Sequence, residues 1–179
     1  MREERPTRDQ LRVLIPEERL QARIKELGAQ IRADYGDRPI TCVGVLKGSF
    51  MFMADLVRAI GGDIRCEFLA VSSYHGGTRS TGVVRITEDL RTPIEGQDTL
   101  VIEDIIDTGL TLDYLLRSLQ VRGPASLKTC CLLDKPAHRE VALDSDYVGF
   151  SIPDEFVVGY GLDLAERYRN LPHIAVYTP

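Results

Sequence analysis

The stretch Thr99-Leu-Val-Ile-Glu-Asp-Ile-Ile-Asp-Thr-Gly-Leu-Thr-Leu112 decides the fold of this chain. Its apolar opening, Leu100-Val-Ile102, is typical of a buried strand. Four leucines then recur at the spacing of a helix: Leu112, Leu115, Leu116 and Leu119. We therefore predict a strand, a tight turn and a helix over Thr111–Gln120.

The predicted turn collects polar groups. It holds three carboxylates, two hydroxyls and a glycine: Glu103, Asp104, Asp107, Thr108, Thr111 and Gly109. Free backbone N–H groups at the start of a helix favour an anion such as phosphate. Carboxylates repel phosphate unless they face a sugar diol or a divalent cation, so the pattern indicates a phosphorylated ribose with Mg²⁺. The alternative, a plain helix cap by Asp107 or Thr108, gives the other two acids no role.

Length and composition predict one soluble globular domain with a sizeable core, because 179 residues are 44% hydrophobic and 27% charged. The net charge of −5 argues against a nucleic-acid partner. No apolar run is long enough for a membrane span, and Met1–Pro6 lacks the apolar core of a secretory signal. We therefore expect no membrane contact and a cytoplasmic location. Reduced, buried thiols are expected at all four cysteines, Cys42, Cys66, Cys130 and Cys131.

The rest of the chain alternates helical and extended patterns. Residues 1–14 are expected to be a partly ordered arm, followed by a helix that begins at Pro16 and ends at Gly36. Strands are predicted at 40–46, 64–72, 83–86 and 126–133, with a further helix at 50–60. Beyond residue 147 we expect short extended pieces and a short helix near Asp163–Arg169. This alternation is typical of an α/β fold, in which helices cover a parallel sheet.

The stretch Val101–Leu112 resembles the phosphoribosyl-pyrophosphate (PRPP) motif of type I phosphoribosyltransferases, and its paired acids look most like the hypoxanthine-guanine branch. The resemblance extends from about Ile40 to Tyr177. It implies the type I phosphoribosyltransferase fold, with a Rossmann-like central parallel sheet, flanking helices and a small hood lobe. Residues 1–179 would form one domain, with a core of about 36–145 and a hood of about 146–179 plus N-terminal residues.

The resemblance also implies roles for individual residues. PRPP and its 5′-phosphate would be bound by Glu103, Asp104, Asp107, Thr108, Gly109, Leu110 and Thr111, although some relatives carry lysine where Leu110 stands. Pyrophosphate would be held by Lys47, Gly48 and Arg169, with an unusual cis peptide before Lys47. Magnesium would be held by Glu103, Asp104 and Asp163.

A lid would carry Ser73 and Tyr74, and the purine would meet Lys135, Phe156 and Val157. Four of the residues given roles by the resemblance also have a plainer interpretation, and for Tyr74 this is a tyrosine at a strand end. Lys47 fits a solvated strand end, Phe156 fits the core, and Asp163 fits an N-cap for the short C-terminal helix.

The reaction implied is attack by N9 of a 6-oxopurine on the anomeric carbon of PRPP, with Asp107 as general base. Two alternatives stay open, a regulatory PRPP-binding protein and a xanthine or pyrimidine phosphoribosyltransferase. The family forms dimers and tetramers, so a homodimer or homotetramer is expected.

Overall fold

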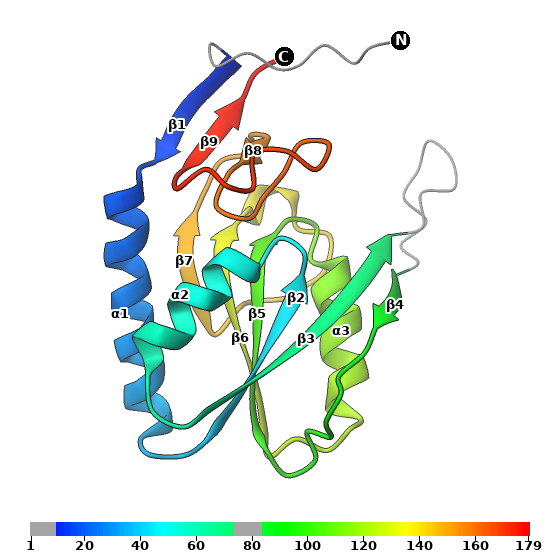
Figure 1. Cartoon of the computed structure of the whole chain (residues 1–179). Coiled ribbons are helices and arrows are strands. Elements are labelled where there is room, and N and C mark those ends of the chain that lie inside the picture. Colours follow the sequence, from blue (N-terminus) through cyan, green and yellow to red (C-terminus); the bar gives the residue numbers. More distant parts are fainter. Residues whose placement is uncertain (1–9, 74–83) are drawn as a thin grey trace.

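A six-stranded sheet forms the centre of the molecule in this computed structural model, which describes residues 10–73 and 84–179 (Figure 1). Its strand order is β4-β3-β2-β5-β6-β7. These strands are β2 Ile40–Leu46, β3 Ile64–Ser73, β4 Val84–Glu88, β5 Asp98–Ile106, β6 Ser126–Asp134 and β7 Tyr147–Ser151. All neighbouring strands pair in parallel except β3 and β4, which are antiparallel. The predicted α/β class with a mostly parallel sheet is confirmed.

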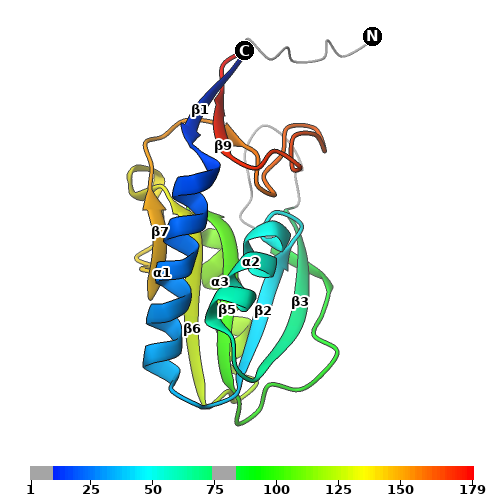
Figure 2. The same cartoon turned by 60° about the vertical axis from the view of Figure 1, so that its left-hand side comes forward.

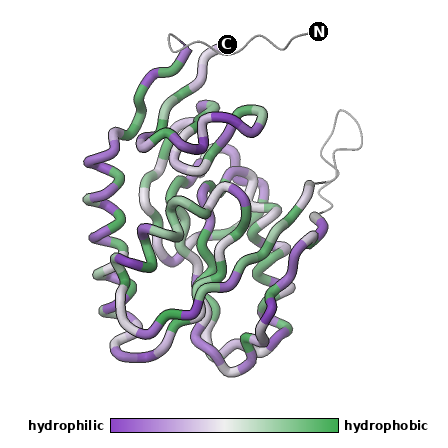
Figure 3. The backbone as a smooth tube through the Cα atoms, viewed as in Figure 1, coloured by the Kyte–Doolittle hydropathy of each residue, from purple (hydrophilic) through white to green (hydrophobic). Residues whose placement is uncertain are grey.

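Helices cover both faces of this sheet. α1 Glu17–Tyr35 and α2 Phe50–Ile60 lie on one face, and α3 Leu110–Gln120 lies on the other (Figure 2). Side chains alternate between the two faces along each strand, so Leu100 and Ile102 of β5 pack towards α1 and α2, while Val101 packs towards α3. The central strands are therefore apolar along most of their length (Figure 3).

A second, three-stranded sheet joins the two ends of the chain. It consists of β1 Leu11–Ile15, β9 Ile174–Tyr177 and β8 Val157–Val158, all antiparallel. Of the partly ordered arm expected at residues 1–14, residues 11–14 belong to β1, which pairs with β9, and residues 1–9 lie outside the described residues. β7 belongs to the large sheet by strand pairing, although residues 147–151 lie within the range expected for the hood.

Two predictions from the sequence were wrong. The short helix expected near Asp163–Arg169 is absent from the described chain, which forms turns and an isolated bridge between Leu164 and Arg167 there. Positive φ angles at Ala165 and Glu166 exclude a right-handed helix. The second wrong prediction concerns Cys66, which was expected to be buried and is exposed. The other three cysteines are buried, and all four are free.

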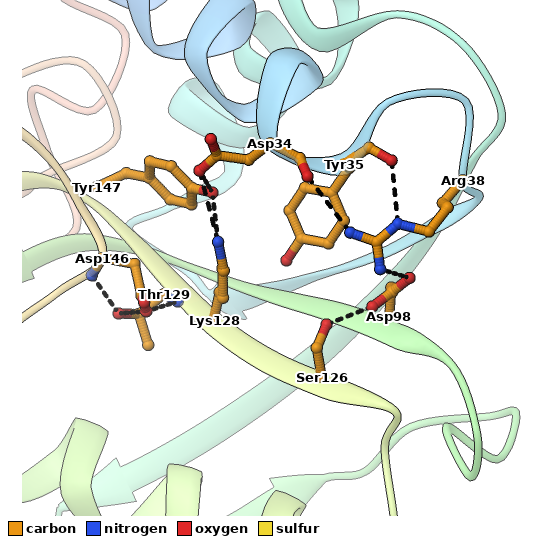
Figure 4. A network of polar contacts seen from close by, with 9 residues as sticks. All are labelled: Asp34, Tyr35, Arg38, Asp98, Ser126, Lys128, Thr129, Asp146 and Tyr147. Carbon is orange, nitrogen blue, oxygen red and sulfur yellow. Dashed lines mark hydrogen bonds and ion pairs between the residues drawn. The ribbon is translucent and has the colours of Figure 1, made fainter.

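A polar network connects the end of α1 to the starts of β5, β6 and β7 (Figure 4). The Tyr147 hydroxyl donates to Asp34 at 2.6 Å, and the Lys128 ammonium lies 3.4 Å from the same carboxylate. Arg38 pairs with Asp98 at 2.7 Å. The network lies at the amino-terminal edge of the parallel strands, so it supports the scaffold at the end of the sheet opposite the predicted site. No helix among the described residues combines the length and apolar character that a membrane span requires.

Candidate active site

The predicted site residues converge at the carboxyl-terminal edge of the large sheet. Lys47 and Gly48 follow β2, Asp107–Thr111 follow β5, and Lys135 follows β6. In open α/β sheets, ligands bind at this edge. Ser73 ends β3, whereas Tyr74 lies outside the described residues, so the predicted lid stays a prediction.

Glu103 and Asp104 lie within β5, because this strand extends to Ile106, beyond the boundary predicted from its apolar opening. Glu103 is buried, and its Oε2 atom has no hydrogen-bond partner among the described residues. Burial, reinforced by the neighbouring Asp104 charge, raises the pKa of Glu103 well above its usual value. Burial also raises the pKa of Asp104 to about 6, against the opposing effect of the Ile105 N–H, which donates to its carboxylate at 2.8 Å. Two carboxylates so poorly solvated favour a cation.

The turn after β5 surrounds a small cavity of about 170 Å³ lined by residues 103–109, 111 and 112. Gly109 is the N-cap of α3 and has a φ of 84°, so neither Asp107 nor Thr108 occupies the cap. A side chain at Gly109 would bring its Cβ within 2.9 Å of Val141 Cγ2. The N-cap position thus has no side chain, although the Thr108 hydroxyl accepts the Leu110 N–H at 3.4 Å, and the amides at the start of α3 line a cavity of suitable size for phosphate.

The Lys47–Gly48 turn is packed tightly between two other parts of the site. The Leu46–Lys47 peptide is cis, as the resemblance implied. A Cβ at Gly48 would lie 1.5 Å from Asp104 Oδ2, and a Cβ at Gly161 would lie 2.0 Å from the Gly48 carbonyl oxygen. A side chain at Gly48 would overlap the Asp104 carboxylate, so the backbone of this turn directly adjoins that acid of β5.

Three charged side chains beyond β8 complete this half of the site. Arg169 lies 2.8 Å from the Asp163 carboxylate and donates to the Gly161 carbonyl at 2.7 Å. The Nε atom of Arg169 is buried without a partner in the described chain. Lys47 pairs with Glu166 at 3.1 Å, a partner that the sequence did not predict. Asp163 accepts the backbone N–H of Glu166 at 2.7 Å and caps no helix.

The predicted purine residues lie beside β6 and in the small sheet. Lys135 is buried and lies 3.6 Å from Asp154. Phe156 is 52% exposed and contacts Tyr177 edge to face, so the interpretation of Phe156 as a core residue was wrong. Val157 is buried in β8, opposite Val176.

Sequence reasoning missed the groups that surround Asp107. His138 contacts the Asp107 carboxylate at 2.9 Å, and Arg139 donates to the Asp107 carbonyl at 3.1 Å. The other imidazole nitrogen of His138 lies 2.9 Å from Asp154. His138 is the last residue of the 3-10 helix η2 Pro136–His138, which follows β6, and Arg139 comes directly after it. No local pattern marks them, because their role depends on contacts between distant parts of the chain.

A family model for the phosphoribosyl transferase domain matches residues 16–165. The chain belongs to the phosphoribosyl transferase family. Its relatives include a hypoxanthine-guanine phosphoribosyltransferase of Staphylococcus epidermidis, which is 54% identical over 93% of each chain.

Two solved structures are similar to this phosphoribosyl transferase. A hypoxanthine phosphoribosyltransferase of Staphylococcus aureus is 52% identical with a TM-score of 0.92, over 96% of this chain and 94% of that chain. The Trypanosoma cruzi hypoxanthine phosphoribosyltransferase, in complex with its product IMP, is 46% identical with a TM-score of 0.89 over 98% of both chains. The predicted type I phosphoribosyltransferase fold is confirmed.

Proposed function

We propose that this chain transfers the 5-phosphoribosyl group of PRPP to N9 of hypoxanthine or guanine, which gives IMP or GMP and pyrophosphate. The observation that carries this proposal is a continuous set of contacts from Asp107, at the phosphate cavity, through His138 and Asp154 to Lys135. A proton acceptor and a donor for a purine oxygen therefore lie close to the same cavity. The names of the relatives support the same reaction.

The purine half of the reaction rests on Asp107 and Lys135. Asp107 would accept the N7 proton, so that N9 attacks with restored electron density. Lys135 would donate to the 6-oxo group, an atom that adenine replaces with an amino donor. The exposed face of Phe156 would stack on the base, and the backbone of Val157 would meet the base edge.

The ribose half rests on the acids of β5 and the turn that follows. Glu103 and Asp104 would orient the ribose hydroxyls and favour the positive charge that develops on the sugar ring. The amides of Thr108–Thr111 and the hydroxyls of Thr108 and Thr111 would hold the 5′-phosphate. Lys47, the Gly48 amide and the unpartnered Nε of Arg169 would bind pyrophosphate.

Magnesium fits this donor set. The unpartnered Oε2 of Glu103 and the adjacent Asp104 carboxylate are hard oxygen ligands, and Asp163 would serve a second Mg²⁺ through the pyrophosphate. In the described part of the chain, no three His, Cys, Asp or Glu side chains gather closely enough to hold a metal alone. This agrees with an ion held jointly by one or two carboxylates and substrate oxygens. When bound, Mg²⁺ would neutralise charge on the leaving pyrophosphate.

The test is pyrophosphate release from PRPP and Mg²⁺, measured in parallel with hypoxanthine, guanine, xanthine, adenine and uracil. Turnover with hypoxanthine or guanine, and none with adenine or uracil, is expected. Turnover with only xanthine or uracil would refute the proposed base pocket. Tight PRPP binding without turnover of any base would favour a regulatory protein instead.

We also propose a homodimer or homotetramer and a cytoplasmic location, as the resemblance and composition predicted. The mass of the protein in solution, measured by light scattering on a sizing column, tests the assembly. A monomer at the concentration of the activity assay would contradict it.

A further inference from the structure

Four ionisable side chains form an unbroken row across the proposed purine site. The Asp107 carboxylate lies 2.9 Å from His138 Nδ1, and His138 Nε2 lies 2.9 Å from Asp154 Oδ2. The other Asp154 oxygen lies 3.6 Å from the Lys135 ammonium. The residues come from three separate segments, which follow β5, follow β6 and precede β8. The row therefore depends on the tertiary fold.

The imidazole ring of His138 lies at the centre of the row, between Asp107 and Asp154. A neutral imidazole has one N–H donor and one lone pair, so it donates to only one of two carboxylates. Imidazolium donates from both nitrogens. Both ring nitrogens of His138 lie 2.9 Å from carboxylate oxygens, so the side chain bridges Asp107 and Asp154.

The same short segment holds Asp107 by its side chain and by its backbone. His138 contacts Oδ1 of Asp107, whereas no donor in the described chain reaches Oδ2. Arg139 donates to the Asp107 carbonyl at 3.1 Å, and the Glu140 N–H donates to the Thr108 carbonyl at 2.9 Å. One carboxylate oxygen is thereby fixed, and the other is left for a substrate proton.

The two ends of the row would address one edge of the substrate. N7 and the 6-oxo group of a 6-oxopurine lie side by side on the same edge of the ring. Under the proposed function, Asp107 serves N7 and Lys135 serves the oxygen. Their spacing must then match that edge, and Asp154 and His138 are the groups that connect them.

We propose that His138 is a positioning residue for the purine, an inference that rests on the proposed function. By direct contact His138 positions Asp107 for the N7 atom of the base, and through Asp154 it positions Lys135 for the 6-oxo atom. Its ion-pair contacts are with Asp107 and Asp154, and none joins it to the ribose acids Glu103 and Asp104 or to the pyrophosphate residues Lys47 and Arg169 in the described chain. Its removal therefore acts on the purine and spares PRPP.

The experiment compares wild type with H138A, using hypoxanthine at saturating PRPP and then PRPP at saturating hypoxanthine. H138A should lower kcat/KM for hypoxanthine about tenfold and keep KM for PRPP within about twofold. H138R keeps a cation with several donors between the two carboxylates and should recover most of the loss. D144A is the matched control, since Asp144 is exposed on the chain between η2 and β7, outside the row, and it should behave as wild type.

A double-mutant cycle adds D154A and the H138A/D154A pair. If the two residues act as one unit, the pair should lose about as much kcat/KM for hypoxanthine as the more severe single variant. Additive losses would overturn the proposal, as would H138A with unchanged purine kinetics. Equal losses for purine and PRPP with a lowered unfolding midpoint would assign His138 a merely structural role, which also overturns it. A wild type that turns over no 6-oxopurine would refute the proposed function itself, whereas the other outcomes leave that function intact.

Discussion

Asp107 is the residue on which the proposed proton transfer depends. D107N keeps the size of the side chain and removes its capacity to take the purine proton. General-base catalysis contributes roughly 10²–10⁴-fold, so kcat should fall by about 100-fold or more, while KM for PRPP stays within about threefold. Steady-state kinetics with hypoxanthine measures both quantities. An unchanged kcat would end the assignment of Asp107 as the base.

The control for D107N is D113N. Asp113 lies in the first turn of α3 and pairs with Arg117 at 3.1 Å on the helix surface, an i,i+4 pair outside the phosphate cavity. The substitution removes the same charge from a nearby position, and kcat and KM should both match wild type. Loss of activity in D113N would mean that net charge around α3, and not proton transfer, explains D107N.

At Gly48 an added side chain would overlap the Asp104 carboxylate. The Cβ of G48A would lie 1.5 Å from Asp104 Oδ2, so the turn and the acid must move apart. Because misplacement by about 1 Å costs roughly 100-fold in an oriented site, kcat/KM for PRPP should fall by about that factor. The comparison is G123A, whose Cβ would meet nothing nearer than Glu95 Cγ at 3.7 Å. G123A has a positive φ of 70° and should lose stability but keep its kinetics well below its unfolding temperature.

At the scale of secondary structure elements, the spacing of apolar residues predicted the features that depend on neighbouring residues in the sequence. Leu112, Leu115 and Leu119 do line the buried side of α3, because helical spacing alone places them there. The helix predicted near Asp163–Arg169 is wrong because the conformation of this segment depends on side-chain contacts and not on the spacing of apolar residues. Arg169 turns back to Asp163 and Gly161, and these contacts hold a chain with positive φ at Ala165, which no helical pattern could reveal.

The site residues also include some that the sequence predicts and some that it does not. Lys47, Asp107 and Lys135 follow strands, so the resemblance and the strand pattern together placed them at one edge of the sheet. His138 and Asp154 could not be predicted, since each gains its role from a partner far along the chain. Glu103 was expected in a turn, and its burial within β5 followed from the length of the strand.

One contact between elements has a predictable effect on stability. The Tyr160 hydroxyl and the Gln21 amide both donate to Asp55 of α2, so this carboxylate links α1, α2 and the chain beyond β8. Y160F removes one donor to a charged, partly buried acceptor and should cost about 1–2 kcal/mol of unfolding free energy near neutral pH. Urea denaturation measures the loss.

The cost of Y160F should depend on pH. Burial raises the pKa of Asp55, but the hydrogen bonds from Tyr160, Gln21 and Arg58 outweigh it and hold the pKa below its usual value. The unfolded pKa is about 3.9, so the contribution is complete above about pH 4 and disappears as pH falls through the folded pKa. The difference between wild type and Y160F should therefore shrink in acid. Y114F is the control, since Tyr114 is 41% exposed on α3; a pH-independent cost for Y160F would contradict the charged bond.

At the scale of the whole molecule, the distribution of charge predicts that PRPP binding depends on a divalent cation. The chain carries a net charge of −5, and the proposed ribose site places Glu103 and Asp104 side by side in a buried strand. PRPP itself is strongly anionic, so these carboxylates repel it unless a cation lies between them. We expect the free protein to stay folded without that cation.

Thermal unfolding with and without ligands tests this dependence. PRPP with Mg²⁺ at about 100 times Kd should stabilise the fold by about 2.7 kcal/mol, which raises Tm by roughly 5–10 °C for a chain of this size. Excess EDTA should abolish most of that rise and leave the Tm of the free protein unchanged. A drop in the Tm of the free protein with EDTA would reveal a resident metal. An equal rise with PRPP alone would mean that Lys47 and Arg169 overcome the repulsion without a cation.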